Sequence, residues 1–280
     1  MTYQQLRPQR FDVLPPVIKN LIIINGLVLL AQKTGEMWGY DDWITRYFAL
    51  HNVQSEFFMP HQLITHLFMH GDFTHFFFNM FALWMFANML ENIWGSKRFL
   101  IFYFLCGLGA ATLHLATFSI EYHLLLNEAS AFLQHSTPTQ FERFLDDQPG
   151  VYRFFNNLEV KTLLNEWKKN PYELNFIDQA KQCVIDYRDL SLNIPTVGAS
   201  GAVFGALAAF GYLFPNTLIY IYFFFPIKAK WFVILYAGAE LWMGVRNSGG
   251  NVAHFAHLGG ALIGFLLVYY WNKKNRQTFY

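Results

Sequence analysis

The apolar positions of this chain fall in long runs rather than in the alternating or one-sided patterns of soluble domains. Six runs are long enough, or nearly so, to cross the hydrocarbon core of a bilayer, which is about 30 Å thick. They lie at roughly 17–33, 72–92, 98–119, 198–214, 230–245 and 252–271. An aromatic run before residue 230 could extend the fifth backward. The pattern predicts an all-α, polytopic membrane protein with six spanning helices.

A polar and charged segment, residues 120–196, separates the third run from the fourth. Thr137-Pro138-Thr139-Gln140 and Asn170-Pro171-Tyr172-Glu173 each combine a capping residue, a proline at the first helical position and Gln or Glu at the third. We therefore expect an insert of two or three short helices. The resulting organisation is a tail (1–16), spans one to three (17–119), the insert (120–196), spans four to six (197–272) and a second tail (273–280).

Basic residues indicate the orientation of the spans. They lie at the start of the first span, between spans two and three, between spans four and five, and after span six: Arg7, Arg10, Lys19, Lys97, Arg98, Lys228, Lys230, Lys273, Lys274 and Arg276. An even number of spans puts these four regions on one side, which the positive-inside rule makes the cytoplasm. We expect a multi-pass protein of the cell (inner) membrane with both termini cytoplasmic and an extracytoplasmic insert.

The composition supports a membrane protein. Hydrophobic residues make up 54% of the chain and charged residues 14%, whereas soluble domains carry about 25% charge. A net charge of +1 gives no indication of a nucleic-acid partner. The two cysteines, Cys106 and Cys183, lie in an apolar and a polar segment, so we expect no disulfide. No small-residue cleavage site follows the first run, which we interpret as a retained span.

The fourth run begins with the sequence Gly198-Ala199-Ser200-Gly201. Its 17 residues span about 25 Å as a helix, which is shorter than the hydrocarbon core. Ser200 should therefore lie inside the membrane, near the external face. The first N–H groups of a helix have no intrahelical partner and can stabilise a developing oxyanion. Ser200 is the candidate nucleophile.

Two glycine ridges connect this run with the sixth. Gly201 and Gly205 form one G-x-x-x-G ridge, and Gly260 and Gly264 form the other, with His257 one turn before Gly260. Such ridges let helix backbones approach closely, as a Ser–His hydrogen bond of about 2.6–3.2 Å would require. Alternatively, the ridges only pack helices and Ser200 only caps its own helix. The histidine on the matched ridge favours chemistry.

The second run adds polar side chains. His75 and Asn79 are four residues apart and share one helix face. Such groups are costly in a span, usually face its interior, and can donate hydrogen bonds to an oxyanion. Alternatively, they join neighbouring helices.

No carboxylate is evidently placed to orient His257. Glu240 lies in the fifth run, but its spacing gives no reason to include it in a catalytic triad. His254, three residues before His257, is interpreted as a polar residue near the external mouth. We therefore predict a Ser–His dyad.

Together these motifs resemble the rhomboid family of intramembrane serine proteases. The matching pieces are His70 with His75-x-x-x-Asn79, then Gly198-Ala199-Ser200-Gly201, then Ala256-His257-x-x-Gly260-x-x-x-Gly264. Glu91 and Gly95 also fit the family pattern at the end of the second span. The chain departs from many bacterial relatives where they carry a Trp-Arg pair, because His61 and Gln62 stand there. The long insert is a second departure.

The resemblance implies a six-helix rhomboid bundle with a water-filled cavity open to the outside. It implies Ser200 as nucleophile and His257 as general base, then general acid. His75, Asn79 and the Ser200 N–H would stabilise the oxyanion, while Gly198 shapes the loop and Phe204 packs on the histidine. The implied substrates are transmembrane proteins in the lipid bilayer, cleaved near the external face, with no cofactor and no metal.

Two other functions remain open from the sequence. His61, His66, His70 and His75 are clustered and could bind metal in a membrane oxygenase. However, no H-x-x-H-H motif occurs and few carboxylates accompany them. The second alternative is a catalytically silent rhomboid-like protein that binds transmembrane clients.

Overall fold

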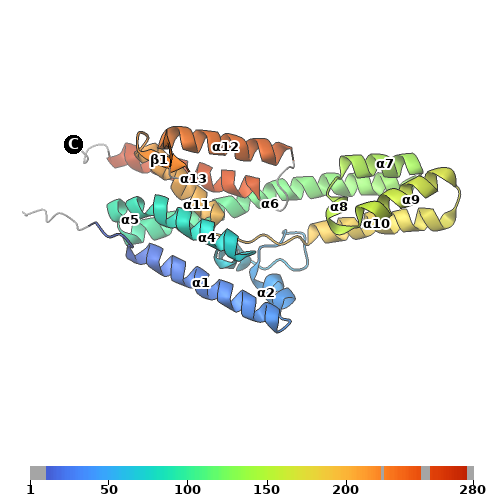
Figure 1. Cartoon of the computed structure of the whole chain (residues 1–280), viewed down its shortest axis with the longest axis horizontal. Coiled ribbons are helices and arrows are strands. Elements are labelled where there is room, and N and C mark those ends of the chain that lie inside the picture. The colour runs from blue at the N-terminus through green and yellow to red at the C-terminus, as the bar shows by residue number, and fades with distance from the viewer. Residues whose placement is uncertain (1–10, 222–223, 247–252, 276–280) are drawn as a thin grey trace, which may run out of the picture. The chain divides into compact units, whose positions relative to one another are not determined.

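The computed structural model describes residues 11–221, 224–246 and 253–275. The packing of the backbone divides the chain into two compact units (Figure 1). The membrane unit comprises Met1–Leu50, Met59–His114 and Thr196–Tyr280, and the insert unit comprises His51–Phe58 and Leu115–Pro195. Parts of the expected tails, residues 1–10 and 276–280, lie outside the described residues, as do residues 247–252 before the sixth span.

Helices build most of the membrane unit. Their bounds are α1 Pro16–Met37, α2 Asp41–Phe48, α3 Gln62–Thr65, η1 His66–Phe68, α4 Phe73–Ala82, the π-helical η2 Leu83–Ala87, α5 Asn88–Trp94, the first part of α6 Ser96–Gln134, α11 Ser200–Leu213, α12 Ala229–Val245 and α13 His254–Asn275. Among the residues that the structure describes, four helical segments are long and apolar enough to cross a membrane: Pro16–Met37, Phe73–Trp94, Ser96–Gln134 and His254–Lys273. Helix α11 is apolar but shorter.

The membrane unit also contains a short two-stranded hairpin, which the prediction of helices alone did not include. Strands β1 (Leu218–Ile221) and β2 (Phe225–Lys228) pair antiparallel, with Leu218 opposite Lys228. This is the aromatic run that could have extended the fifth span backward. Pro226 cannot continue a helix, and β-branched and aromatic residues favour strands, so the run forms a hairpin and α12 begins only at Ala229.

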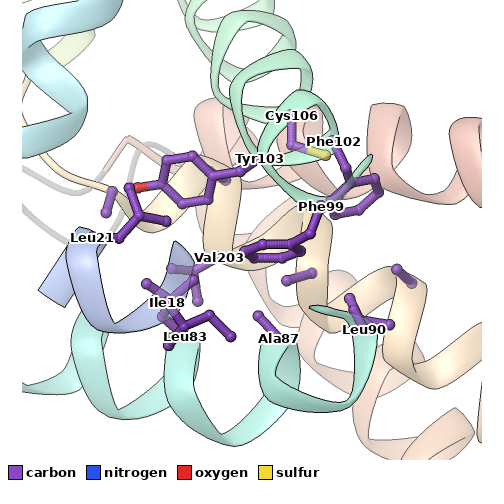
Figure 2. Packing of buried hydrophobic residues seen from close by; sticks show 14 of the residues in the cluster. Ile18, Leu21, Leu83, Ala87, Leu90, Phe99, Phe102, Tyr103, Cys106 and Val203 are labelled. Atoms are coloured by element: carbon purple, nitrogen blue, oxygen red, sulfur yellow. The ribbon is translucent and has the colours of Figure 1, made fainter. Parts of the chain in front are cut away.

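Helix α11 is the most enclosed helix of the membrane unit. Every residue from Gly201 to Gly211 is buried, as expected of a helix that is apolar on all sides. Val203 belongs to a core shared with α1, η2, α5 and α6 (Figure 2). The core residues labelled there include Ile18, Leu21, Leu83, Phe99 and Tyr103. This enclosure fixes the helix that begins at Ser200.

Helices α11 and α13 touch through their glycines. A Cβ atom on Gly260 would overlap the carbonyl oxygen of Gly201, and one on Gly264 would overlap that of Gly205. Because backbone lies against backbone at both places, no side-chain movement could make room. Gly260 and Gly264 therefore set the separation of the helices that carry Ser200 and His257, whereas a Cβ on Gly201 or Gly205 would first meet Ala110 or Cys106 of α6.

Glu91 fastens the start of α1 to the end of α5. Its carboxylate accepts hydrogen bonds from the backbone N–H groups of Val17 (2.9 Å) and Ile18 (3.0 Å) and from the Ser96 hydroxyl (2.6 Å). A negative charge is favourable at a helix N-terminus. Gly95, with φ of 79°, connects α5 to α6 in a conformation that other residues rarely adopt.

The helix that contains the third span does not end at the expected boundary. Helix α6 continues from Ser96 through Gln134, so the expected boundary at 119–120 lies within a helix. The reason is local: neither glycine nor proline occurs between Gly109 and Pro138, and such residues are the usual helix breakers. The chain thus passes from the membrane unit into the insert unit within α6.

The insert has more helical structure than the two or three short helices expected. After α6 come α7 (Pro138–Asp147), α8 (Val151–Phe154), α9 (Asn157–Lys169) and the 19-residue α10 (Leu174–Leu192). The helix start predicted at Pro138 is confirmed, because the Thr137 side chain accepts from the Gln140 N–H. The start predicted at Pro171 is wrong. Asn170 instead ends α9, and α10 begins only at Leu174.

The insert unit has an aromatic core of its own. Phe132, Phe141 and Trp167 pack together, with ring centroids 5.6 Å apart for the first pair and 6.0 Å for the second. Residues 51–58 join this unit by hydrogen bonds. The Ser55 hydroxyl donates to Asn193 Oδ1 (2.6 Å), and Asn52 Nδ2 donates to Ser119 Oγ (3.3 Å). Both cysteines, Cys106 and Cys183, are free.

Candidate active site

Ser200 is the first residue of α11, and the loop before it is pinned on several sides. Thr196 pairs with Leu50 through two backbone hydrogen bonds of 2.8 and 2.9 Å, and its hydroxyl lies 2.7 Å from His114 Nε2. Gly198 has a φ of 129°, which side-chain-bearing residues rarely adopt, and donates its N–H to the His66 carbonyl (2.9 Å). These contacts place Ser200 where its N–H belongs to the free first turn of the helix.

The structure brings Ser200 and His257 together. His257 Nε2 lies 2.9 Å from Ser200 Oγ, within the range of a nucleophile–base hydrogen bond. The Phe204 ring, one turn after the serine, stacks on the imidazole with centroids 4.2 Å apart and planes 5° from parallel. The stack limits rotation of the ring, so Nε2 is held toward the hydroxyl.

The opposite edge of the imidazole faces a carboxylate, which we did not expect. Glu240 Oε2 lies 3.0 Å from His257 Nδ1 and 2.7 Å from His254 Nδ1. The expectation that no carboxylate lies beside His257 was therefore wrong, and His254 is buried against Glu240. The sequence did contain a signal, because an acid in a span usually has a specific partner. It did not identify the partner, since Glu240 and the histidines lie on different helices.

His75 lies on the other side of the serine loop. A Cβ atom on Gly198 would be 2.9 Å from His75 Cε1, 3.0 Å from His75 Nε2 and 3.6 Å from Ser200 Oγ. The space that a Gly198 side chain would occupy is therefore bordered by both the imidazole and the hydroxyl, and only glycine leaves it open. Asp72 caps α4 by accepting the His75 N–H (2.8 Å).

Asn79 follows His75 by one turn of α4. It is buried, and its Nδ2 has no hydrogen-bond partner among the residues that the structure describes. An unpaired buried amide is costly in a protein of this kind. An N–H donor of this type is free to bind an oxyanion.

The clustered histidines of the metal-enzyme alternative do not form a metal site. His66 Nδ1 donates to the Gln62 carbonyl (2.6 Å), and His61 Nε2 lies 2.7 Å from the Tyr47 carbonyl. Burial lowers the pKa of His66 to about 4, so its ring is neutral at pH 7. Within the described part of the chain, the group with ligand atoms close enough to hold a metal ion is Glu240, His254 and His257. None of the four clustered histidines belongs to it.

The comparison with known families settles what kind of protein this is. The rhomboid domain matches residues 58–125 and 176–274, more than half of the chain. The chain belongs to the rhomboid family. With several apolar helices of spanning length, it is a multi-pass membrane protein. The matched residues include Ser200 and His257 and leave out residues 126–175, in the middle of the insert.

Two yeast proteins share part of this rhomboid domain. Rhomboid protein 1, mitochondrial, of Saccharomyces cerevisiae is 40% identical over 87 residues, which are 30% of this chain and 25% of the yeast protein. An uncharacterized mitochondrial rhomboid protein of Schizosaccharomyces pombe is 36% identical over 86 residues, which are 28% of this chain and 22% of that protein. The matches thus span about a quarter of either yeast protein.

Proposed function

We propose that this protein is an intramembrane serine endopeptidase that cleaves transmembrane proteins near the external membrane face. The observation that carries the proposal is the 2.9 Å contact between Ser200 Oγ and His257 Nε2 at the start of a buried helix. A serine hydroxyl becomes a useful nucleophile when an adjacent base takes its proton. A purely structural serine would have no need of a stacked, oriented imidazole.

The reaction follows from this geometry. Ser200 Oγ attacks the scissile carbonyl carbon while its proton passes to His257 Nε2, and the carbonyl oxygen becomes an oxyanion. His257 then gives the proton to the leaving amine, the C–N bond breaks, and an acyl ester remains on Ser200. A water molecule, deprotonated by His257, then attacks the ester carbonyl. The bond from that carbon to Ser200 Oγ breaks, His257 returns the proton to Oγ, and the new carboxyl end is released.

The oxyanion would be stabilised by the donors around Gly198. The Ser200 backbone N–H lies at the first turn of α11, His75 lies against Gly198, and Asn79 offers an unpaired amide. Donors that are already in place and sheltered from water stabilise developing charge most effectively. Three such groups give one oxygen enough hydrogen bonds.

The substrate class and location are parts of the same proposal. The family resemblance favours transmembrane substrates that enter from the bilayer, and the distribution of basic residues favours cytoplasmic termini with an extracytoplasmic insert. The sequence suggested a cell inner membrane, whereas the two yeast relatives are named as mitochondrial. Protease protection of tagged termini in isolated membranes would determine the orientation.

Cleavage of a transmembrane reporter by the purified protein in lipid vesicles tests the activity. We expect the parent to cleave and Ser200→Ala to lose cleavage by at least about 10³-fold, because removing a nucleophile leaves only binding and oxyanion effects. Ser136→Ala is the matched control. It removes a hydroxyl that only bonds the Phe132 carbonyl within the insert unit, so cleavage should be unchanged.

Other outcomes would point elsewhere. Equal cleavage by the parent and Ser200→Ala would identify a contaminating protease. If neither cleaves any of several reporters, but the parent retains a transmembrane protein on co-purification, the silent client-binding function would replace the protease.

A further inference from the structure

We propose that Glu240 is a positioning residue for His257, so that the catalytic group is Ser200–His257–Glu240 rather than a dyad. The inference rests on the protease function proposed above. It concerns the side of the imidazole that faces away from Ser200. There the carboxylate of α12 meets two histidines of α13.

The tautomer of His257 provides the first argument. Nε2 can take a proton from Ser200 Oγ only if it carries no hydrogen, so in the neutral ring the hydrogen must be on Nδ1. Nδ1 is the atom that lies 3.0 Å from Glu240 Oε2. A carboxylate only accepts hydrogen bonds, so its presence there favours the productive tautomer.

The charge that develops during the reaction provides the second argument. Although Glu240 Oε2 lies 3.0 Å from His257 Nδ1, Nδ1 makes no hydrogen bond within the described structure. Charge attraction depends less on angle than a hydrogen bond does. When His257 takes the serine proton it becomes a cation 3.0 Å from this oxygen, and the two side chains are only 12% and 4% exposed, so their attraction is stronger than it would be in bulk water. Glu240 would therefore stabilise the transition state more than the resting enzyme.

His254 explains how the carboxylate is held. Its Nδ1 lies 2.7 Å from the same Glu240 oxygen, and both side chains are nearly inaccessible, at 8% and 4% exposure. A buried acid in a span is costly and needs a partner. His254, which lies one turn before His257 on α13, supplies that partner and holds the Glu240 oxygen in place.

A structural role is the competing explanation. The Glu240–His254 pair links α12 to α13, and this contact between helices could by itself account for a buried acid. The two explanations differ in what Glu240→Gln should change. Losing a contact that only links two helices lowers the stability of the fold, whereas losing a positioning residue slows the chemical step.

The test compares Glu240→Gln with Ser200→Ala, the parent and Glu91→Gln. The Glu240→Gln substitution keeps the side-chain shape, and we expect kcat on a transmembrane reporter to fall about 10- to 100-fold with KM nearly unchanged. That loss is smaller than the ~10⁴-fold of a soluble triad that loses its acid, because Phe204 already orients the ring. Acylation of Ser200 by a fluorophosphonate, followed in the same samples, should slow by a similar factor.

Glu91→Gln is the control because Glu91 is equally buried, but its carboxylate bonds the start of α1 and Ser96 rather than a histidine. It should lower the melting temperature and leave kcat at a permissive temperature unchanged. Parent-like kcat and acylation for Glu240→Gln, with an active parent and an inactive Ser200→Ala, would overturn the inference and leave the protease intact. A stoichiometric metal in the purified parent, with cleavage lost on chelation, would also overturn it, because the three ligand atoms would then hold an ion.

Discussion

At the residue scale, His257 is held on three sides. Ser200 lies 2.9 Å from one ring nitrogen, Glu240 lies 3.0 Å from the other, and Phe204 covers the ring face. Ser200 and Glu240 together favour the hydrogen on Nδ1 and a free Nε2. Phe204 limits rotation of the ring, and Glu240 attracts the positive charge that forms during the reaction. The site is therefore arranged before any substrate binds, which is the condition for efficient electrostatic catalysis.

Asn79 is predicted to act in the transition state. Asn79→Ala removes the unpaired amide and should lower kcat about 10²- to 10³-fold, the usual effect of losing one oxyanion donor, with little change in KM. Steady-state cleavage of a reporter would measure both constants.

Asn25→Ala is the matched control for Asn79→Ala. Asn25 is also buried in a span, but its Nδ2 donates to the Leu21 carbonyl of its own helix (2.7 Å). Its removal should leave kcat unchanged. Equal losses in both variants would contradict an oxyanion role for Asn79.

At the scale of elements, the contact between α11 and α13 decides whether the two reactive groups meet. The serine and the histidine are 57 residues apart, and the glycines bring their helices together. Gly260 and Gly264 lie directly against the backbone carbonyls of Gly201 and Gly205, with no side chain between them.

Gly260→Ala should therefore damage both stability and activity. The added methyl would overlap the Gly201 carbonyl, and forced overpacking of this kind costs typically about 1–3 kcal/mol or more. We expect a lower melting temperature and loss of reporter cleavage, because α13 must move away from Ser200.

Gly238→Ala provides the comparison within a helix of the same unit. A Cβ atom there meets nothing within 4 Å, and alanine is favoured over glycine in helices by up to ~1 kcal/mol. Its melting temperature should stay the same or rise. Parent-like behaviour of Gly260→Ala would show that the ridge contact is looser than described.

At the scale of the whole molecule, the two units share no buried core among the described residues. The core of the membrane unit gathers around α11, whereas the insert unit has Phe132, Phe141, Phe144 and Trp167. Those four residues lie in the part of the chain that the family match leaves out. The insert is thus a folded addition to a rhomboid domain, and two cores without shared residues can unfold separately.

The two free cysteines report on the two cores. Burial, with a smaller effect of Asp186, raises the pKa of the Cys183 thiol to about 11, so little reactive thiolate exists at pH 8 in the folded insert. We expect a short pulse of N-ethylmaleimide to label Cys183 at lower urea concentration than Cys106, because lipid protects the membrane unit. Site-resolved mass spectrometry would measure the labelling of each cysteine. Equal urea midpoints for the two cysteines would contradict separate unfolding of the two units.

The sequence alone indicated a multi-pass helical membrane protein and singled out Ser200, His257 and the glycines around them as candidates. Hydrophobic runs, the i, i+3 and i, i+4 spacings and helix caps are local signals, so they can be read within one segment. The continuation of α6 to Gln134 was equally readable from its lack of glycine and proline, and we placed its end too early. The hairpin before α12 follows from Pro226 and its neighbours in the same way.

Only the tertiary structure decided what surrounds His257. Glu240 and His257 lie on α12 and α13, and no periodicity relates a position on one helix to a position on another. Their 3.0 Å contact depends on how far each helix is rotated and shifted against its neighbour, which packing of the whole unit fixes. The sequence could supply the acid and the base, but only the fold could place them together.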